Sequence, residues 1–127
     1  VEIVRIPLMN KDSLQMTPQD HELIARTAGS MAEAHDGVVI VHGTDRLAVT
    51  GERIHALIVK ARVPIVLTGA MRPYELRSTD ALQNLIEALL AVQLLPAGVY
   101  VSMHNQVLQF PGVTKDKGLG TFVKAAP

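Results

Sequence analysis

Apolar residues follow two different spacings along this chain, and each spacing predicts a type of element. Continuous apolar runs, at 38–41 and in the segment 64–68 up to Thr68, predict strands buried on both faces, because a strand covered on one side only would alternate. Residues 1–6 do alternate between apolar and polar, and they predict a further strand. Residues 99–103 and 106–110 are expected to form the last two strands, paired as a hairpin.

Three intervening segments repeat apolar residues every three or four positions, which predicts helices over 17–34, 46–61 and 78–93. The start of the first helix is well marked. Thr17 can cap it, Pro18 suits its first position, and Asp20 places an acid in its first turn. The tail from Pro111 has lysines among glycines, and its pattern is the least informative of the chain.

The repetition of strand, helix and strand predicts an α/β fold. We expect a three-layer, doubly wound, mainly parallel sheet with right-handed crossovers and helices on both faces. The 127 residues are enough for a single domain. Ligands of such sheets bind beyond the carboxyl ends of the strands. The loops at 10–16, 42–45 and 69–77 should therefore meet at one edge and carry the site.

Composition narrows the classes of partner. Lys+Arg and Asp+Glu both number 12, so the charge balance gives no reason to expect a nucleic acid or a membrane as partner. The chain has no cysteine, which excludes disulfides and thiolate chemistry. No apolar run approaches the ~20 residues needed to span a bilayer. The five histidines lack metal-ligand spacing, so we expect a small-molecule ligand and no bound metal.

The turn after the second predicted strand has the residues best suited to chemistry. Gly43 permits a close approach to a ligand, Thr44 offers a hydroxyl, and Asp45 offers a carboxylate for an amine. The free N–H groups of the following helix favour an anion. The alternative is that Thr44 or Asp45 simply caps that helix.

Three other segments offer weaker candidates. Ser13, next to Asp12, can present a hydroxyl to a carboxylate, or the pair can belong to a solvated turn. Gly69 and Ala70 form either a ligand-lining backbone or an ordinary loop. Lys115 is by default a surface lysine, and it acquires a role only if it folds back beside Asp45. The motifs of serine hydrolases, P-loops and dinucleotide sites are missing.

Several segments, in order, resemble the bacterial L-asparaginase family. Residues 36–45 resemble the strand that runs into the family's His-Gly-Thr-Asp signature, and 68–73 with 78–85 resemble its Gly-Ala-Met-Arg-Pro segment and the next helix. Residues 12–16 resemble the Asp-Ser-x-x-Met loop of cytoplasmic members, and 113–115 resembles the lysine segment. Together they cover nearly the whole chain.

The resemblance implies hydrolysis of L-asparagine to L-aspartate and ammonia without a metal or other cofactor. It implies that Thr44 is one of two active threonines and that Lys115, paired with Asp45, activates its hydroxyl. Asp45 would also bind the substrate α-ammonium, and the Asp12–Ser13 loop would bind substrate, with Ser13 on the α-carboxylate. The backbone of Gly43 and Ala70 would line the amide pocket.

The chain departs from the family pattern at its front and its end. The family's first motif, Thr-Gly-Gly-Thr-Ile, does not occur, and neither does the smaller C-terminal domain. Leu14 and Arg46 replace residues common in the family. We therefore expect residues 1–127 to be one domain of the N-terminal asparaginase type, similar to short single-domain relatives.

The function keeps two alternatives to an asparagine amidohydrolase. One is a non-catalytic amino-acid-binding or regulatory module, and the other is an amidotransferase subunit that keeps the pocket. We expect a cytoplasmic protein. We also expect a homo-oligomer, a dimer or a tetramer, because the missing strand would leave a sheet edge exposed.

Overall fold

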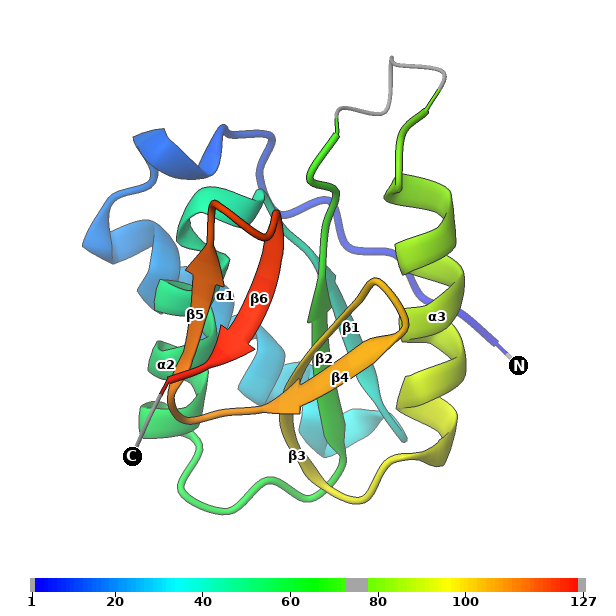
Figure 1. The fold of residues 1–127 in the computed structure, drawn as a ribbon. Coiled ribbons are helices and arrows are strands. Elements are labelled where there is room, and N and C mark those ends of the chain that lie inside the picture. Colours follow the sequence, from blue (N-terminus) through cyan, green and yellow to red (C-terminus); the bar gives the residue numbers. More distant parts are fainter. Residues whose placement is uncertain (1, 73–77, 126–127) are drawn as a thin grey trace.

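A computed structural model describes residues 2–72 and 78–125 of the chain (Figure 1). The first half contains η1 (Ser13–Gln15), α1 (Pro18–Ala34), β1 (Val38–Val41), η2 (Thr44–Arg46), α2 (Leu47–Leu57) and β2 (Pro64–Thr68). The second half contains α3 (Ala81–Leu94), β3 (Gly98–Met103), β4 (Gln106–Gln109), β5 (Val113–Asp116) and β6 (Thr121–Lys124). The η elements are single turns of 3₁₀ helix.

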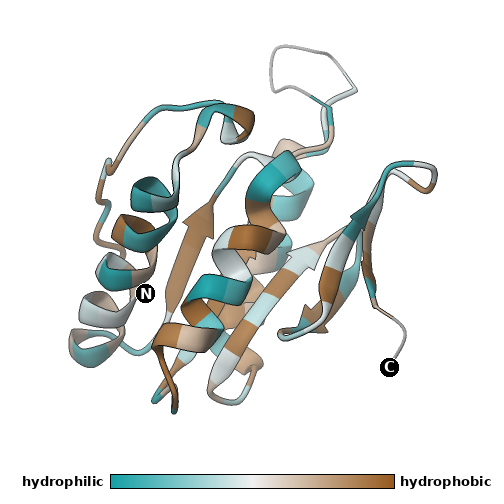
Figure 2. Ribbon diagram, turned by 90° about the vertical axis from the view of Figure 1, so that its left-hand side faces the viewer, coloured by the Kyte–Doolittle hydropathy of each residue, from teal (hydrophilic) through white to brown (hydrophobic). Residues whose placement is uncertain are grey.

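The predicted α/β architecture is confirmed. Strands β1, β2 and β3 are parallel neighbours, and β4 adds an antiparallel edge, while β5 and β6 form a separate hairpin. Helices α1 and α2 cover one face of the sheet, and α3 covers the other (Figure 1). Figure 2 shows that the strands of the central sheet are largely apolar.

The two faces of β2 explain why both sides need a cover. Ile65 and Leu67 point into the core beneath α1 and α2, whereas Val66 packs with Ala88 of α3. All of β2 is buried, because it is the only strand with a parallel neighbour on each side among the described residues. The predicted burial of this strand on both faces is confirmed.

The prediction that every crossover is right-handed is wrong. The chain moves from β1 to β2 and from β2 to β3 in one direction across the sheet. Helix α2 makes the first connection over one face, and α3 makes the second over the opposite face. The two crossovers therefore have opposite hands, and one is left-handed, a rare arrangement. This arrangement places α3 over Val66 and Tyr100. With two right-handed crossovers both helices would lie on the same face, and these two side chains would stay uncovered.

Two strand predictions also need correction. Residues 2–6 form no strand: Ile3, Val4 and Ile6 are exposed, and the described chain offers them no neighbouring strand for hydrogen bonding. Strand β1 forms where expected but is only half-buried, because it lies at the edge of the sheet. The side chain of Val41, at its end, is 71% exposed.

The helices begin close to the expected positions. Thr17 and Asp20 cap α1 reciprocally, each side chain accepting from the other's backbone N–H. Helix α2 is shorter than predicted and stops at Leu57, not at residue 61. The next two residues, Ile58 and Val59, are β-branched, and Val59 is almost fully exposed, so burial offers nothing to extend the helix.

A chain of hydrogen bonds between buried side chains joins α1, α2 and the end of β1. The Thr50 hydroxyl, fully buried on α2, lies 2.6 Å from Nδ1 of His21 and 2.7 Å from Nε2 of His42. His42 Nδ1 lies 2.6 Å from the Gly43 carbonyl oxygen, which can only accept, so Nδ1 carries a proton. A neutral His42 then accepts the Thr50 proton at Nε2, and Thr50 accepts from His21.

Helix α2 accommodates a bulky neighbour at Gly51. The ring of Phe110, buried at the end of the β4 segment, lies against this glycine, and a Cβ added there would be 2.1 Å from the ring. A Cβ added at Gly29 of α1 would meet only Ile58, at an ordinary 3.5 Å. Two helical glycines of this chain thus sit in opposite environments.

We expect Gly51→Ala to lower the free energy of unfolding by about 1–2 kcal/mol, because overpacking against Phe110 outweighs the gain in helix propensity. Gly29→Ala is the matched control and should raise it by up to about 1 kcal/mol. Urea denaturation of both variants beside the parent measures the difference. Equal effects of the two substitutions would contradict the proposed packing.

We expect stability to fall as pH decreases below 6.5. Burial lowers the pKa of both His42 and His21 from the ordinary 6.5. Between that value and their lowered folded-state pKa values, the unfolded chain binds protons that the folded chain does not, so acid favours unfolding. The carboxyl groups with lowered pKa values act in a lower window, starting near 4.5.

Urea denaturation at pH 7.5 and 5.5 checks this dependence. His21→Asn keeps a donor near the position of Nδ1 but does not titrate, so it should lose part of the dependence. An unchanged dependence in that variant, or a parent that gains stability at pH 5.5, would refute the assignment.

Candidate active site

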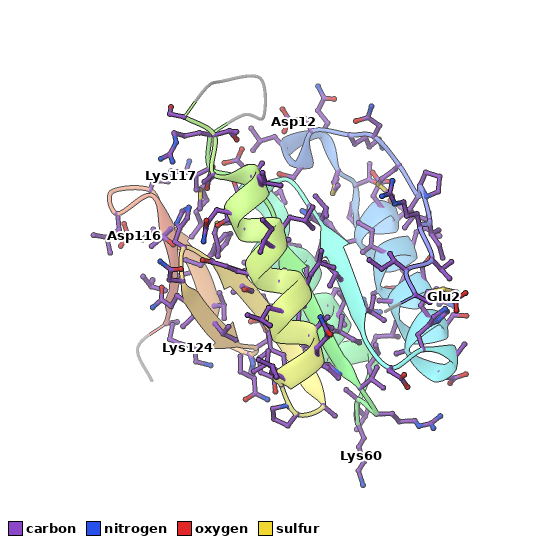
Figure 3. The ribbon with its side chains drawn as sticks, turned by 90° about the vertical axis from the view of Figure 1, so that its right-hand side faces the viewer. Glu2, Asp12, Lys60, Asp116, Lys117 and Lys124 are labelled. Atoms are coloured by element: carbon purple, nitrogen blue, oxygen red, sulfur yellow. The ribbon has the colours of Figure 1, made fainter. Side chains whose placement is uncertain are left out.

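The expected convergence of loops takes place at the carboxyl ends of β1 and β2. The single turns η1 and η2 contact each other there, and the His42 N–H donates to the Thr68 carbonyl, 2.8 Å away, joining the two strand ends. Figure 3 shows Asp12 and Lys117 at this end of the molecule, with Lys60 at the other. Residues 73–77, the rest of the predicted loop after β2, lie outside the described residues.

Lys115 lies beside Thr44 and Asp45. Its Nζ donates to Thr44 Oγ1 at 2.9 Å and to Asp45 Oδ1 at 2.8 Å, across about 70 positions of sequence. The β5–β6 hairpin brings this lysine to the site, because Phe122, its partner across the hairpin, is buried in the core. The interpretation of Lys115 as an ordinary surface residue is therefore wrong.

The ion pair sits at the border between the core and solvent. Thr44 is buried at 8% exposure, while the side chains of Lys115 and Asp45 are 18% and 34% exposed. The hydrogen bond from Lys115, together with its charge, holds the pKa of Asp45 below its usual range. Asp45 is thus a carboxylate at neutral pH. The Lys115 side-chain nitrogen, which bonds to Asp45, also lies directly beside the Thr44 hydroxyl.

Ser13 reaches the same turn from η1. Its fully buried side chain accepts the Arg46 N–H at 3.1 Å, which fixes η1 against η2. A Cβ on Gly43 would lie 2.9 Å from Ser13 Oγ, so only glycine allows this approach. Asp12 accepts the Leu14 N–H at 3.0 Å and thereby caps η1. The sequence anticipated a hydroxyl at Ser13 but not this tie to η2.

The segment after β2 lies against Thr44. A Cβ on Gly69 would be 2.2 Å from the His42 carbonyl oxygen and 3.3 Å from the Thr44 methyl group. The backbone at Gly69 and half-buried Ala70 therefore comes close to the threonine turn. Glycine is required here because any side chain would push the two strand ends apart.

A second polar cluster, which the sequence did not identify as a site, lies beyond this segment. Asp80 is buried at 6% exposure and accepts the N–H groups of Met71 and Arg72 at 3.0 and 2.8 Å. His104 and Asn84 also bind this carboxylate. The resemblance at 78–85 included Asp80 and Asn84, but no spacing linked them to His104, which is 24 positions away.

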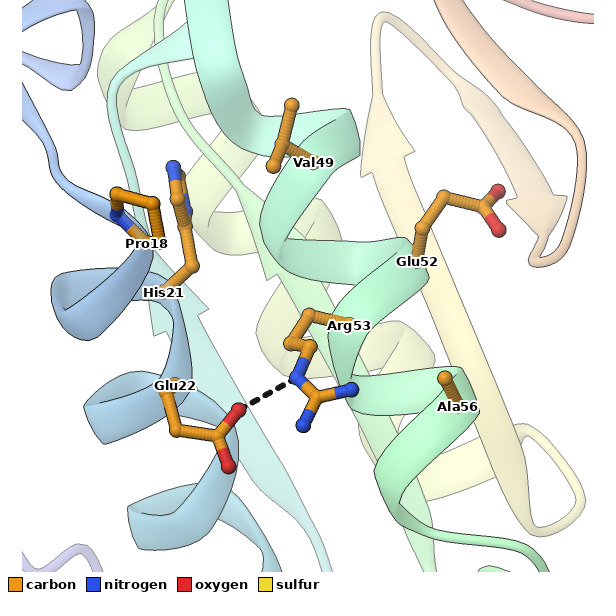
Figure 4. A pocket seen from close by; sticks show the side chains of 7 residues that line it. All are labelled: Pro18, His21, Glu22, Val49, Glu52, Arg53 and Ala56. Carbon is orange, nitrogen blue, oxygen red and sulfur yellow. Dashed lines mark hydrogen bonds and ion pairs between the residues drawn. The ribbon is translucent and has the colours of Figure 1, made fainter.

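A cavity of about 480 Å³ lies away from this edge, between α1 and α2 (Figure 4). Its lining includes His21, Val49 and the ion pair of Glu22 with Arg53, which measures 2.5 Å. None of the predicted site residues borders it. We place the candidate site at the strand ends because the hydroxyl, ammonium and carboxylate groups meet there.

Metal sites and membrane-spanning helices are two further features to consider. Within 2–72 and 78–125, no three His, Asp or Glu side chains converge in a way that could hold a metal ion. No helix in these ranges combines the length and the hydropathy that crossing a lipid bilayer requires.

Comparison with known proteins finds similarity to L-asparaginases. A family model described as "Asparaginase, N-terminal" matches residues 1–121. An L-asparaginase of Thermococcus kodakarensis is 34% identical over 113 residues, which make up 89% of this chain and 34% of the relative. The solved structure of the thermostable L-asparaginase from that organism has a TM-score of 0.82 and 31% identity, covering 92% of this chain and 36% of that one.

Two other similarities widen the range of relatives. The crystal structure of a probable cytoplasmic L-asparaginase from Campylobacter jejuni has a TM-score of 0.74 and 38% identity, covering 84% of this chain and 35% of that one. One subunit of a glutamyl-tRNA(Gln) amidotransferase from Methanobrevibacter smithii is 40% identical over 80 residues, 63% of this chain and 18% of the relative.

The chain spans about a third of the length of the L-asparaginases it matches, and less of the amidotransferase subunit. The match over residues 1–121, and the threonine, aspartate and lysine brought together at the strand ends, agree with each other. The chain belongs to the asparaginase family, to the part described as its N-terminal domain.

Proposed function

We propose that this chain serves a threonine-dependent amidohydrolase that converts L-asparagine, or a close analogue, to L-aspartate and ammonia. The observation that carries the proposal is the contact of Lys115 Nζ with both Thr44 Oγ1 and Asp45 Oδ1. An ammonium group on a hydroxyl lowers the cost of its ionisation, which is the activation that a threonine nucleophile or a threonine-bound water needs.

The proposed roles follow from the groups available around Thr44. Asp45, ionised and partly exposed, binds the substrate α-ammonium while it holds Lys115. The η1 loop, with Asp12 and Ser13, binds substrate, and the Ser13 hydroxyl binds the α-carboxylate. The backbone beside Gly43 and Ala70 lines the amide pocket and stabilises negative charge on the carbonyl oxygen as water adds and ammonia leaves.

Thr44 and Lys115 form one part of the catalytic centre in this proposal. In the family pattern the second active threonine lies on a strand that ends in Thr-Gly-Gly-Thr-Ile, a motif that residues 1–127 do not contain. The edge of β1 that faces away from β2 has no strand beside it in residues 2–72 and 78–125, and it ends next to the threonine turn. An added strand at that edge would bring its last residues close to Thr44.

A second candidate function is a component of an amidotransferase, where the released ammonia passes to a partner. The similarity to a glutamyl-tRNA(Gln) amidotransferase subunit favours it, because the same chemistry would then be coupled to another protein. A binding module that has lost turnover is the third candidate. Ammonia release distinguishes the three. The amidohydrolase releases ammonia by itself, the amidotransferase component does so together with its partner, and the binding module does not release it.

We further propose a cytoplasmic location and assembly into a homo-oligomer. The likeness to a structure named as a probable cytoplasmic L-asparaginase supports the location. Exposed apolar side chains on α3 support self-association. They lie four residues apart on one side of the helix, at Leu82, Ile86, Leu90 and Leu94. The exposed edge of β1 is a second surface suited to pairing.

We expect Thr44→Ala to reduce ammonia release from L-asparagine by at least about 100-fold, a typical cost of removing one catalytic group. Lys115→Met should have a similar effect because the hydroxyl loses its ammonium neighbour. Thr44→Ser keeps the hydroxyl and should retain part of the activity. The measurement is coupled detection of ammonia from the purified protein.

Thr27→Ala is the control for these variants, because Thr27 lies on α1 and bonds only within its helix, at the Leu23 carbonyl. Activity that survives Thr44→Ala would remove the threonine from the mechanism. A parent without turnover that still binds L-asparagine, with affinity lost in Asp45→Asn, would transfer the proposal to the binding module.

We expect light scattering of the purified protein to give a mass of two or four chains at micromolar concentration. Replacing Ile86 and Leu90 by glutamine should shift the mass towards one chain if α3 contributes to the interface, because polar side chains weaken the burial of the apolar surface. A single-chain mass for the parent at high protein concentration would contradict the proposed oligomer.

A further inference from the structure

A network of hydrogen-bonded polar side chains lies at the start of α3, next to the segment after β2, and is formed by Asp80, Asn84 and His104. All its members bond to backbone or side-chain atoms from different elements, and Asn84 is fully buried. Among the described residues, every buried side-chain nitrogen and oxygen atom has a hydrogen-bond partner. We name this set, together with Thr121, the Asp80 cluster.

The Asp80 carboxylate is the acceptor at the centre of the cluster. Oδ1 accepts the Arg72 N–H at 2.8 Å, and Oδ2 accepts the Met71 N–H at 3.0 Å, Asn84 Nδ2 at 3.0 Å and His104 Nε2 at 2.6 Å. Burial alone would raise the pKa of Asp80, but the backbone donors of Arg72 and Met71 and the His104 ring outweigh it and hold the pKa well below the usual range.

Asn84 and His104 extend this anchor in two directions. Asn84 Nδ2 also donates to the Gly69 carbonyl at 2.9 Å, and its Oδ1 accepts the His104 N–H at 3.1 Å. Asp80 and Asn84 together therefore bind three residues of the segment after β2: Gly69, Met71 and Arg72. This is the segment whose backbone lies against Thr44.

The β3–β4 turn aims the His104 ring. His104 and Asn105 both have positive φ, 54° and 61°, as a tight two-residue hairpin turn requires. Few residues other than glycine adopt such φ values, although histidine and asparagine do so more readily than most, and contacts from α3 support both residues in this turn. Asn84 Oδ1 accepts from the His104 N–H, and Glu87 Oε1 accepts from the Asn105 N–H at 2.8 Å.

The other nitrogen of His104 reaches the hairpin that carries Lys115. Nδ1 lies 3.0 Å from Thr121 Oγ1, and Thr121 pairs across the hairpin with Asp116, the residue after Lys115. Because the Asp80 carboxylate only accepts, His104 Nε2 carries a proton and Nδ1 faces the Thr121 hydroxyl. One imidazole thus links the segment after β2 to β6.

We propose that Asp80, through Asn84 and His104, is a positioning residue that holds the Gly69–Arg72 backbone and the Lys115 hairpin in register around Thr44. The inference rests on the proposed function for its catalytic consequence, but the mechanical coupling is a property of the fold. Positioning matters because a displacement of about 1 Å of a catalytic group can cost roughly 100-fold in rate.

Hydrogen exchange measures the coupling without any assay of activity. Thr121→Val removes the hydroxyl that His104 contacts but keeps a β-branched side chain in β6. We expect amides of residues 113–124 to exchange roughly 3- to 10-fold faster, as the loss of one hydrogen bond implies. Thr114→Val, an exposed threonine of the same hairpin outside the cluster, is the matched control and should change nothing.

Two further variants test the centre of the cluster. His104→Asn removes the ring but tolerates positive φ, so it should accelerate exchange of the hairpin as Thr121→Val does, and the double variant should add nothing further. Asp80→Asn should accelerate exchange in both the 69–72 segment and the hairpin. If Asp80→Asn does not fold, the His104 and Thr121 variants decide the hairpin arm.

The catalytic consequence is measured as kcat and KM at a temperature where each variant is folded. Thr121→Val should lower kcat for amide hydrolysis about 10-fold and leave KM within about twofold, because the lysine shifts while the substrate contacts of Ser13 stay. Thr121→Ser restores the hydroxyl and should restore kcat. A residue with only a structural role would lower the unfolding temperature and leave kcat of the folded protein unchanged.

Hydrogen exchange and ammonia release together show whether the coupling or the proposed function is wrong. Faster hairpin exchange in Thr121→Val, found together with a parent protein that releases no ammonia, would support the coupling and refute the proposed function. Thr121→Val and Thr114→Val with the same exchange would overturn the coupling, whatever the activity. If Thr121→Val exchanges faster in the hairpin but keeps the kcat of the parent, the proposed positioning role of the Asp80 cluster in catalysis is overturned.

Discussion

The structure depends on how closely three backbone segments approach at the carboxyl ends of β1 and β2. Gly69 passes so near the His42 carbonyl that a Cβ would lie 2.2 Å from it, and Gly43 passes close to Ser13 in the same way. Both approaches bring main-chain groups to one threonine. The His42–Thr68 backbone hydrogen bond and the contact of Ser13 with the Arg46 N–H hold these segments together.

The sequence predicted well those features that arise from local chemistry. The uninterrupted run at 64–68 identified a strand covered on both faces, and Thr17 with Asp20 marked the start of α1, because capping and burial leave a local pattern. Small polar residues and glycine after a strand predicted that Thr44, Asp45 and Ser13 lie at one edge of the sheet, and the structure brings the turns that carry them into contact.

The missed features depend on partners distant in sequence. Residues 2–6 alternate like a strand, but no described strand lies beside them, and a pattern cannot supply a neighbour. The hand of a crossover depends on the face of the sheet against which its helix packs. For α3 that face is shown by the packing of Val66 on Ala88. The proximity of His104 to Asp80 follows from the β3–β4 turn, so no spacing in the sequence signals it.

The long sequence separation of Lys115 from Thr44 has a consequence for synthesis on the ribosome. The sheet strands β1, β2 and β3 are complete by residue 103, yet the ammonium group arrives only with the β5–β6 hairpin that follows. Chains grow from the N-terminus, and domains begin to fold as they emerge. A nascent or prematurely terminated chain can thus have the layered sheet and still lack the group beside its threonine.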